Sequence, residues 1–271
     1  MKKILFASTA LVASAGFAAA DADFTGAAGF GMIYDGTNWN PDYYTTLNIS
    51  LTGETDGGLS FGADLDLTFD NGGFGVTDNQ VVYIEGGFGK LSVGTVDNAV
   101  DASVSGIKDV GYSGLGVDNL AEAEKGTSTA NALYQGTFGD FSVALSGDLS
   151  SGASDWAIGA KYAMGDFKVG AGVEKDGGNT VYAISAGATF GDIALNALYG
   201  RDSTASNYSY GVDAGYTMGA STITIAYGND DGVEGYGLGI SYDLGGGASV
   251  DAGVAEVNGV TKADLGINMT F

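Results

Sequence analysis

The sequence predicts an all-β protein, a 16-stranded antiparallel transmembrane β-barrel with short turns at one end and longer loops at the other. Three observations predict this fold. Apolar and polar residues alternate along most of the chain, short glycine- and aspartate-rich breaks alternate with longer polar ones, and aromatic residues gather near the ends of the alternating segments. A period of two is typical of β-strands whose two faces meet different surroundings.

Residues 1–20 have the features of a secretory signal peptide. Lys2 and Lys3 form a basic start, residues 4–17 are mostly apolar, and three alanines at positions 18–20 precede the acidic Asp21. These are the basic, apolar and cleavage-site parts of such a signal. We therefore expect 1–20 to be removed on export. Residues 21–271 then form a single barrel domain, because no linker and no change of composition divides them.

The alternation is clearest between residues 59 and 69. A helix would bring Leu65 and Asp64 onto overlapping faces, whereas a strand separates them. The pattern recurs in 141–149, 167–174, 208–218, 236–244 and 263–271. The apolar face of the first segment consists of Leu59, Phe61, Ala63, Leu65, Leu67 and Phe69.

Two kinds of break separate the strands. The short ones are rich in glycine and aspartate, as hairpin turns require, and they lie at 55–58, 86–90, 138–140, 165–166, 191–192, 219–220 and 245–247. The longer ones lie at 35–42, 70–78, 97–129, 150–155, 175–179, 201–206, 229–233 and 257–260. Because the two kinds alternate strictly, they separate sixteen strands, and both chain ends lie on the turn side.

The aromatic residues favour a membrane barrel over a soluble β-sandwich, which also alternates but buries its apolar face. Amphipathic rings prefer the depth where hydrocarbon meets water, and an open sheet edge in lipid is too costly, so the sheet must close. The rings near the turns are Phe61, Phe88, Phe138, Phe141, Tyr162, Phe167, Phe190, Tyr216, Tyr242 and Phe271. The rings near the loops are Tyr34, Tyr44, Phe69, Trp156, Tyr182, Tyr199, Tyr208, Tyr227 and Tyr236.

The composition excludes several classes of function. The chain has no histidine and no cysteine, which removes Ser-His and Cys-His catalysis and the usual zinc sites. A formal net charge of −23 argues against a nucleic-acid partner. Asp64 and Asp66 are the kind of pair that can hydrolyse glycosides, but their place on one strand face indicates lining of the interior. We expect neither enzymatic activity nor a cofactor.

Charged residues gather on the face opposite the large apolar side chains. In a membrane barrel this face encloses water, so these residues are predicted to face the lumen. The main candidates are Asp64, Asp66, Asp148, Lys161, Lys168, Asp213, Asp243, Lys262 and Asp264. Asp23, Glu174 and Asp251 share the same face.

Three sequence patches carry a resemblance to a known family. They are 236–250 together with 263–266, the GFGKLSVG run at 87–94, and the DVGY run at 109–112. The sequence resembles the porins of photosynthetic purple bacteria and their alphaproteobacterial relatives, in pattern over the whole mature chain and in detail at these patches. The resemblance implies a homotrimer in the lipid of a Gram-negative outer membrane, with periplasmic turns, outer loops and a third loop folded into the barrel. It also implies trimer contacts near Ala28, Ala63 and Ala263, and a loop at 70–78 that reaches a neighbouring subunit.

The longest break, residues 97–129, is the candidate for the inward loop. Loops of this length in a compact fold are usually functional or disordered, so a flexible surface loop is the alternative. In the family this position forms the pore constriction. Its carboxylates are Asp97, Asp101, Asp109, Asp118, Glu122 and Glu124, set against only Lys108 and Lys125. Clustered carboxylates also suit calcium, although no EF-hand spacing is present, so plain solvated acid is the simpler interpretation.

These features predict passive diffusion of small hydrophilic solutes and ions, with a preference for cations. Fixed carboxylates in a narrow pore attract cations and repel anions. Porins of this family usually place an arginine cluster opposite the acidic loop, whereas the mature chain here has one arginine, Arg201, in an outer loop. We therefore expect weak specificity. The alternative is a secreted or surface β-rich structural or adhesive protein, which would share the signal peptide, the glycines and the acidity.

Overall fold

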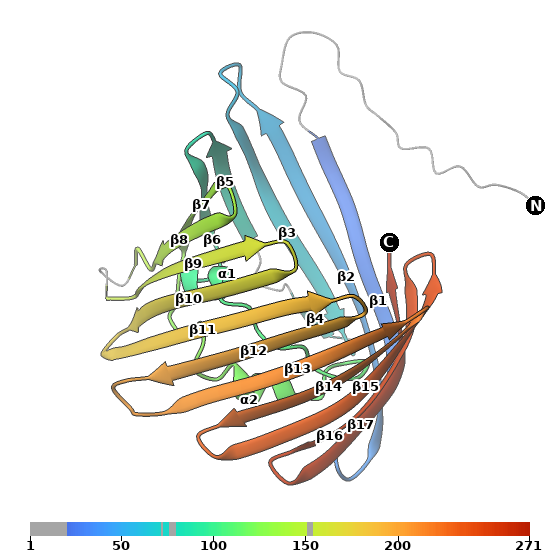
Figure 1. Ribbon diagram of the computed structural model, residues 1–271. Helices are drawn as coiled ribbons and strands as arrows, with labels where there is room; N and C mark the ends of the chain where they lie inside the picture. The colour runs from blue at the N-terminus through green and yellow to red at the C-terminus, as the bar shows by residue number, and fades with distance from the viewer. Residues whose placement is uncertain (1–20, 72, 76–79, 151–153) are drawn as a thin grey trace, which may run out of the picture.

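The computed structural model describes residues 21–71, 73–75, 80–150 and 154–271 as one barrel (Figure 1). The predicted signal peptide, 1–20, lies outside the described residues. So do parts of two predicted loops, at residue 72, at 76–79 and at 151–153. Among the described residues, no helix is long and apolar enough to cross a membrane.

The described residues form a single antiparallel sheet of 17 strands. Sixteen of them build the barrel, and the short β4 only forms a small hairpin with the end of β3. The strands are β1 (Asp21–Tyr34), β2 (Trp39–Glu54), β3 (Ser60–Asp70), β4 (Gly73–Gly75), β5 (Gln80–Gly86), β6 (Gly89–Gly94), β7 (Ala132–Phe138), β8 (Phe141–Gly147), β9 (Trp156–Met164), β10 (Phe167–Asp176), β11 (Asn179–Phe190), β12 (Ile193–Asp202), β13 (Tyr208–Met218), β14 (Ser221–Asp230), β15 (Val233–Gly245), β16 (Ala248–Val257) and β17 (Val260–Thr270). The predicted 16-stranded barrel is confirmed.

The barrel closes between its first and last strands. Gly29 of β1 pairs with Tyr44 of β2 on one side and with Asn268 of β17 on the other. At the turn side, the Gly26 N–H donates to the Phe271 carbonyl oxygen at 3.2 Å, and the Phe271 N–H donates to the Gly26 carbonyl oxygen at 2.9 Å. Closure leaves no free sheet edge, which is what a sheet surrounded by hydrocarbon requires.

The two faces of each strand differ as the alternation predicts. In β13 the outward Val212 is 50% exposed, whereas the neighbouring inward Asp213 is 4% exposed. The outward Ile225 and Leu238 of the next two strands are also at least half exposed, at 54% and 50%. An outer surface this rich in exposed large apolar side chains is typical of a transmembrane barrel that faces lipid.

The connections differ between the two ends of the barrel, the end with the short turns and the end with the loops. All seven short turns lie where they are predicted. On the other side, however, three connections predicted as longer loops are two-residue turns at 177–178, 231–232 and 258–259, because their strands continue further. Asp231-Gly232 and Asn258-Gly259 have positive φ at both positions, 46° and 91° for the first pair and 53° and 73° for the second. These dipeptides favour type I′ hairpins.

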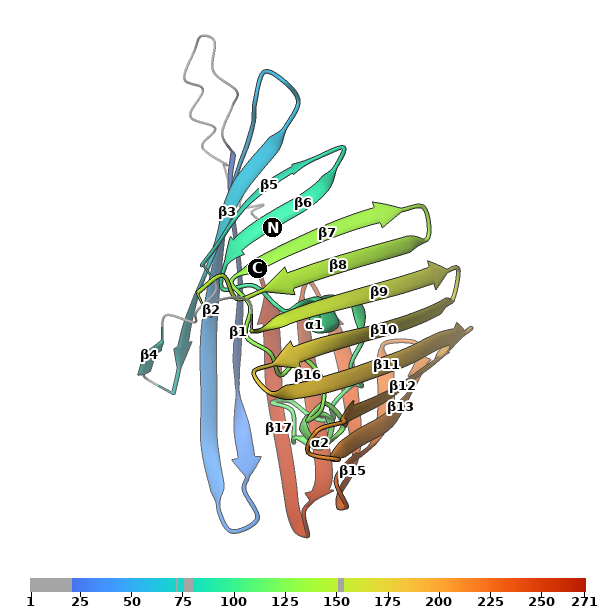
Figure 2. The same cartoon turned by 90° about the vertical axis from the view of Figure 1, so that its left-hand side faces the viewer.

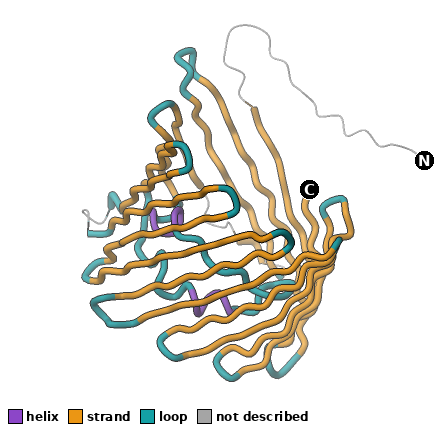
Figure 3. The backbone as a smooth tube through the Cα atoms, viewed as in Figure 1, coloured by secondary structure: helices purple, strands orange, loops and turns teal. Residues whose placement is uncertain are grey.

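The connection between β6 and β7 folds into the barrel. It carries two short helices, α1 (Ala99–Ser103) and α2 (Val117–Ala121), which lie inside the ring of strands (Figures 2 and 3). Helix α1 packs on β8, β9 and β10, and α2 packs on β12 to β15. The apolar core of the protein lies here, around the fully buried Val100 and Val117. The prediction of an inward-folded third loop is therefore confirmed, and the flexible surface loop is wrong.

Candidate functional site

The inner wall makes room for the inward loop through glycines. A Cβ atom on Gly159 would collide with the Ala99 carbonyl oxygen, and one on Gly228 would collide with the Val117 carbonyl oxygen. Because interiors are close-packed, any side chain at these positions would displace the loop. On strands β9, β10 and β12 to β17, the glycines whose Cβ would collide with a loop atom are Gly159, Gly170, Gly172, Gly200, Gly211, Gly228, Gly235, Gly237, Gly239, Gly253 and Gly266. We call them the glycine track.

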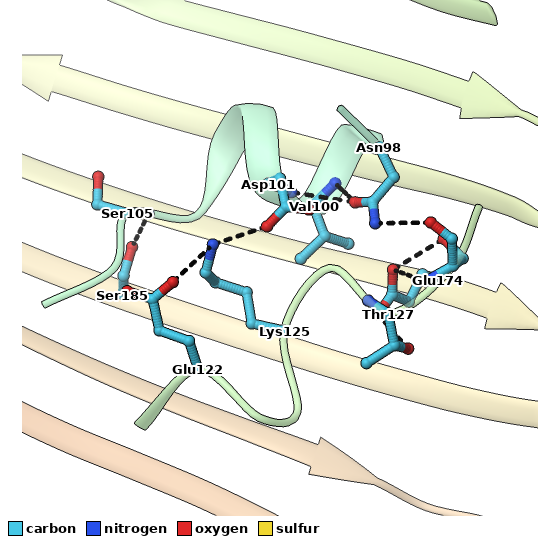
Figure 4. A network of polar contacts seen from close by, with 10 residues as sticks. Asn98, Val100, Asp101, Ser105, Glu122, Lys125, Thr127, Glu174 and Ser185 are labelled. Atoms are coloured by element: carbon cyan, nitrogen blue, oxygen red, sulfur yellow. Dashed lines mark hydrogen bonds and ion pairs between the residues drawn. The ribbon is translucent and has the colours of Figure 1, made fainter. Parts of the chain in front are cut away.

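A buried carboxylate fastens the end of the loop. Glu174 of β10 is fully buried and accepts four hydrogen bonds (Figure 4). The donors are the backbone N–H and hydroxyl of Thr127, at 2.8 and 3.0 Å, and those of Ser128, at 3.2 and 2.9 Å. Hydrogen bonds to an ionised acceptor are among the stronger ones in proteins. Glu174 therefore acts as a clamp on the loop rather than as a charge in water.

Two further wall carboxylates hold the middle of the loop. Asp213 Oδ2 accepts a hydrogen bond from the Lys108 N–H at 2.9 Å, and Asp264 Oδ2 accepts from the N–H and hydroxyl of Ser113 at 2.8 and 2.9 Å. Both carboxylates are at most 4% exposed. They point inward, as their alternation predicts, but the loop covers them. Their charges are thus committed to loop backbone.

Serines of the wall complete the attachment. The hydroxyls of Ser146, Ser185 and Ser209 accept hydrogen bonds from the N–H groups of Ala99, Ser105 and Glu124 at 2.8, 2.9 and 3.0 Å. Loop backbone that lacks helix or sheet partners must find acceptors elsewhere when it is buried. The wall supplies them, strand by strand.

Within the loop, one lysine joins two of the predicted carboxylates. Lys125 Nζ lies 2.7 Å from Asp101 Oδ1 and 3.4 Å from Glu122 Oε2 (Figure 4). Burial lowers the pKa of Lys125, but the hydrogen bond and charge of Asp101, followed by Glu122, outweigh it and raise the pKa overall. The lysine therefore stays charged and neutralises part of this acidic pair.

Asp109 and Asp118 form a second group at the start of α2. Asp109 accepts hydrogen bonds from the N–H groups of Gly116 and Val117 at 2.6 and 3.1 Å, which ties down the first turn of the helix. Burial, then the charge of Asp109, raises the pKa of Asp118 to about 6. This carboxylate thus changes charge nearer neutrality than an ordinary aspartate.

The other two loop carboxylates lie apart from these groups. Asp97 is exposed, just before α1, where Asn98 caps the helix by accepting from the N–H of Val100 at 2.8 Å. Glu124 is half-buried, and burial together with the charges of Asp202 and Asp230 raises its pKa. The six predicted constriction residues therefore form separate groups along the loop instead of one ring.

The remaining predicted lumen charges divide by strand. Asp64 is half-buried on β3, where its Oδ1 accepts from the Ser50 hydroxyl at 2.6 Å, and Asp66 follows on the same face. Asp148 accepts from Asn131 Nδ2 at 2.5 Å, and Asp243 accepts from the Gly245 N–H at 2.7 Å, so both have a local structural role near strand ends.

The predicted lysines lie on other strands. Lys161 and Lys168, on β9 and β10, are half-buried and form no ion pair with any described residue. Lys262 Nζ donates to the Leu115 carbonyl oxygen at 3.4 Å. No group of three or more acidic, histidine or cysteine side chains is arranged to hold a metal within the part of the chain that the structure describes.

Comparison with known proteins shows to which family this barrel and its inward loop belong. The sequence matches the family described as Gram-negative porin over residues 7–262. The chain belongs to this family. A porin of Rhodobacter capsulatus is 31% identical over 130 residues, which are 45% of this chain and 43% of that relative. The aligned part thus spans less than half of that protein.

Solved porin structures share the fold. A porin refined at 1.8 Å resolution is 26% identical, with a TM-score of 0.76 over 93% of this chain and 100% of the other. A mutant porin of Rh. blastica is 19% identical, with a TM-score of 0.72 over the same shares. Porins are channels of the Gram-negative outer membrane and not enzymes, as the sequence predicts. The membership favours a channel over the secreted adhesive alternative.

Sequence reasoning missed how this porin holds its loop. Glu174, Ser146, Ser185 and Ser209 carry much of the attachment, yet none of them stands out from other polar strand residues in the sequence. A usable signal was present in the glycines. Small inward positions recur on neighbouring strands, and such residues mark places where another segment approaches closely.

Proposed function

We propose that this porin is a passive channel for small hydrophilic solutes and ions that prefers cations. The supporting observation is the charge on the inward loop. Asp97, Asp118 and Glu124 form no ion pair with a described residue, whereas one of the two loop lysines, Lys125, is bound between two carboxylates. Uncompensated carboxylates beside a narrow aqueous path raise the local cation concentration.

Residues 97–129 are proposed to form the constriction of this channel. The loop narrows the lumen from the side of β8 to β17, where the glycine track and the buried carboxylates hold it. Its attachment at many separate points supports a fixed narrowing rather than a gate. Across the lumen from it, Asp64 and Asp66 of β3 add acidic charge to the opposite part of the path.

We further propose a homotrimer in the outer membrane, reached through cleavage of residues 1–20. Trimer formation rests on family membership and on the outward face of the first and last strands. Phe24 and Phe30 of β1 are 64% and 54% exposed there, beside the small Ala28. Cross-linking of purified protein, followed by mobility in detergent with and without heating, tests this. A heat-sensitive species of three chains is expected.

The ion preference is tested in a planar lipid bilayer. Purified protein is inserted, a potassium chloride gradient is applied, and the reversal potential is measured. We expect the reversal potential to have the sign produced when potassium permeates more readily than chloride, because the carboxylates repel chloride. A potential of the chloride sign would refute the cation preference, and the absence of conductance would refute the channel itself.

A further inference from the structure

A hollow of about 440 Å³ lies in the inner wall where β9 to β12 meet the inward loop. Three lysines line it: Lys108 of the loop, Lys161 of β9 and Lys168 of β10. Asn196 and Thr189 add polar atoms from the next two strands. Most strand residues that line the hollow are inward by the alternation of their strands, namely Lys161, Ala163, Lys168, Gly187, Thr189, Ala194 and Asn196, whereas Phe167 and Ala188 are outward; the three lysines therefore face the lumen. We call Lys108, Lys161 and Lys168 the lysine cluster.

The lysine cluster has no bonded counter-ion among the described residues. Asp166, in the exposed turn between β9 and β10, is the one acidic residue that lines the hollow. In a chain with 33 acidic and 10 basic residues, three converging lysines without bonded carboxylates are unlike the rest of the interior.

The surrounding residues hold the cluster in place. Asp213 Oδ2 accepts from the Lys108 N–H at 2.9 Å, while Asn196 Nδ2 donates to both oxygens of the same carboxylate at 3.0 Å. Gly187 of β11 leaves room for the aliphatic part of Lys168, since a Cβ there would collide with the lysine Cε. These contacts fix the backbone of Lys108 and leave room for the side chain of Lys168.

Like charges around one hollow repel each other, and this repulsion is relieved when a negatively charged ligand enters. We propose that the lysine cluster is a binding subsite for small oxyanions with two or more negative charges, of the sulfate or phosphate-monoester class. The inference rests on the proposed channel, through which such a solute would reach the hollow. It adds a local anion site to a lumen whose overall preference is for cations.

The test is single-channel recording in potassium chloride with sulfate added at constant ionic strength. Sulfate in the hollow obstructs the path beside the loop, so the wild-type current falls with increasing sulfate until the subsite is full. The double variant Lys161→Gln/Lys168→Gln is expected to need about tenfold more sulfate for the same reduction. The same sulfate titration applied to liposomes that release a neutral sugar gives an independent readout.

Lys90→Gln is the matched control. Lys90 also faces the lumen, but from β6, where its Nζ lies 3.8 Å above the ring of Tyr83. This variant loses one lysine charge in a different wall, as Lys168→Gln alone does within the cluster, and should keep the wild-type response to sulfate, whereas Lys168→Gln should weaken it. An equal response in all of these proteins, or an equal loss in the control, would overturn the subsite while leaving the channel intact. A protein that conducts no potassium chloride would overturn the channel and the subsite with it.

Discussion

The inner wall of the barrel has two parts that use the same residue types differently. The covered wall, formed by the inner face of β8 to β17, carries the loop, and its carboxylates Glu174, Asp213 and Asp264 are buried against loop backbone. The open wall, formed by the inner face of β2, β3, β5 and β6, leaves Asp64 and Asp66 half-exposed. An inward carboxylate is therefore a structural fastener in one part and a candidate for ion attraction in the other. The strand position alone does not distinguish the two roles.

The largest effect is expected from Glu174→Ala on the covered wall. The substitution leaves the four donor groups of Thr127 and Ser128 without their acceptor, which should lower the free energy of unfolding by about 3 kcal/mol. Thermal unfolding in detergent measures the loss, and trypsin cleavage after Lys125 reports release of the loop. Asp64→Ala on the open wall is the control; it loses a single hydrogen bond from the Ser50 hydroxyl, with an expected loss of about 1 kcal/mol. Equal losses in the two variants would remove the distinction between the walls.

Filling the glycine track should have the next largest effect. Gly228→Leu places a side chain where the Val117 carbonyl oxygen lies and should displace α2, with a loss of stability of about 2 kcal/mol. The displaced loop should also change the single-channel conductance. Gly215→Leu is matched to it, because Gly215 also faces inward but a Cβ there would meet only Thr224 Oγ1, at 4.0 Å. An unchanged conductance in Gly228→Leu would show that the loop does not limit the current.

Neutralising the open wall should alter selectivity rather than stability. In Asp64→Asn/Asp66→Asn, loss of two carboxylates beside the aqueous path is expected to lower the potassium-to-chloride permeability ratio about twofold. Asp213→Asn removes a charge that the loop covers, and should reduce stability with a smaller change of this ratio. Reversal potentials of the wild type, the double variant and Asp213→Asn measure the permeability ratio of each protein. A larger shift in Asp213→Asn than in the double variant would contradict the assignment of roles.

The smallest effect is expected from the titration of Asp118. Its pKa is raised from 3.8 to about 6, so the folded protein binds a proton more tightly than the unfolded chain between these values. Its contribution to stability is present at low pH and is lost as pH rises through about 6. The cation preference should change in the opposite sense and decrease as pH falls through this value, when the carboxylate becomes neutral. Reversal potentials measured against pH should show this step in the wild type and not in Asp118→Asn.

Alternation in the sequence was sufficient to predict the barrel, its strand number and its short turns, because side-chain period and turn chemistry are local properties. The outer turns at 231–232 and 258–259 were predicted as longer loops, although Asp231-Gly232 and Asn258-Gly259 are hairpin dipeptides. The polar residues around them obscured this signal. Here the local information was present and was given too little weight.

The fastening of the loop was beyond sequence reasoning for a different reason. Glu174 lies 46 residues from its partner Ser128, and Asp264 lies 151 residues from Ser113. Only the path of the loop over the wall brings these groups together, and a two-residue period carries no information about that path. The sequence predicted that Asp213 and Asp264 face inward, but not what covers them.

The two-residue turns that join β10 to β11, β14 to β15 and β16 to β17 also determine what the cell presents to its surroundings. A hairpin that reverses in two residues adds almost no polypeptide above the rim, so these three connections offer little surface for an antibody or a bacteriophage to bind. Recognition from outside would have to concentrate on the longer connections, such as those at 35–38 and 203–207. Peptide tags inserted for surface display should accordingly be tolerated better at 35–38 than at 231–232, since a two-residue type I′ turn that joins paired strands directly has no spare residues to accept an insertion.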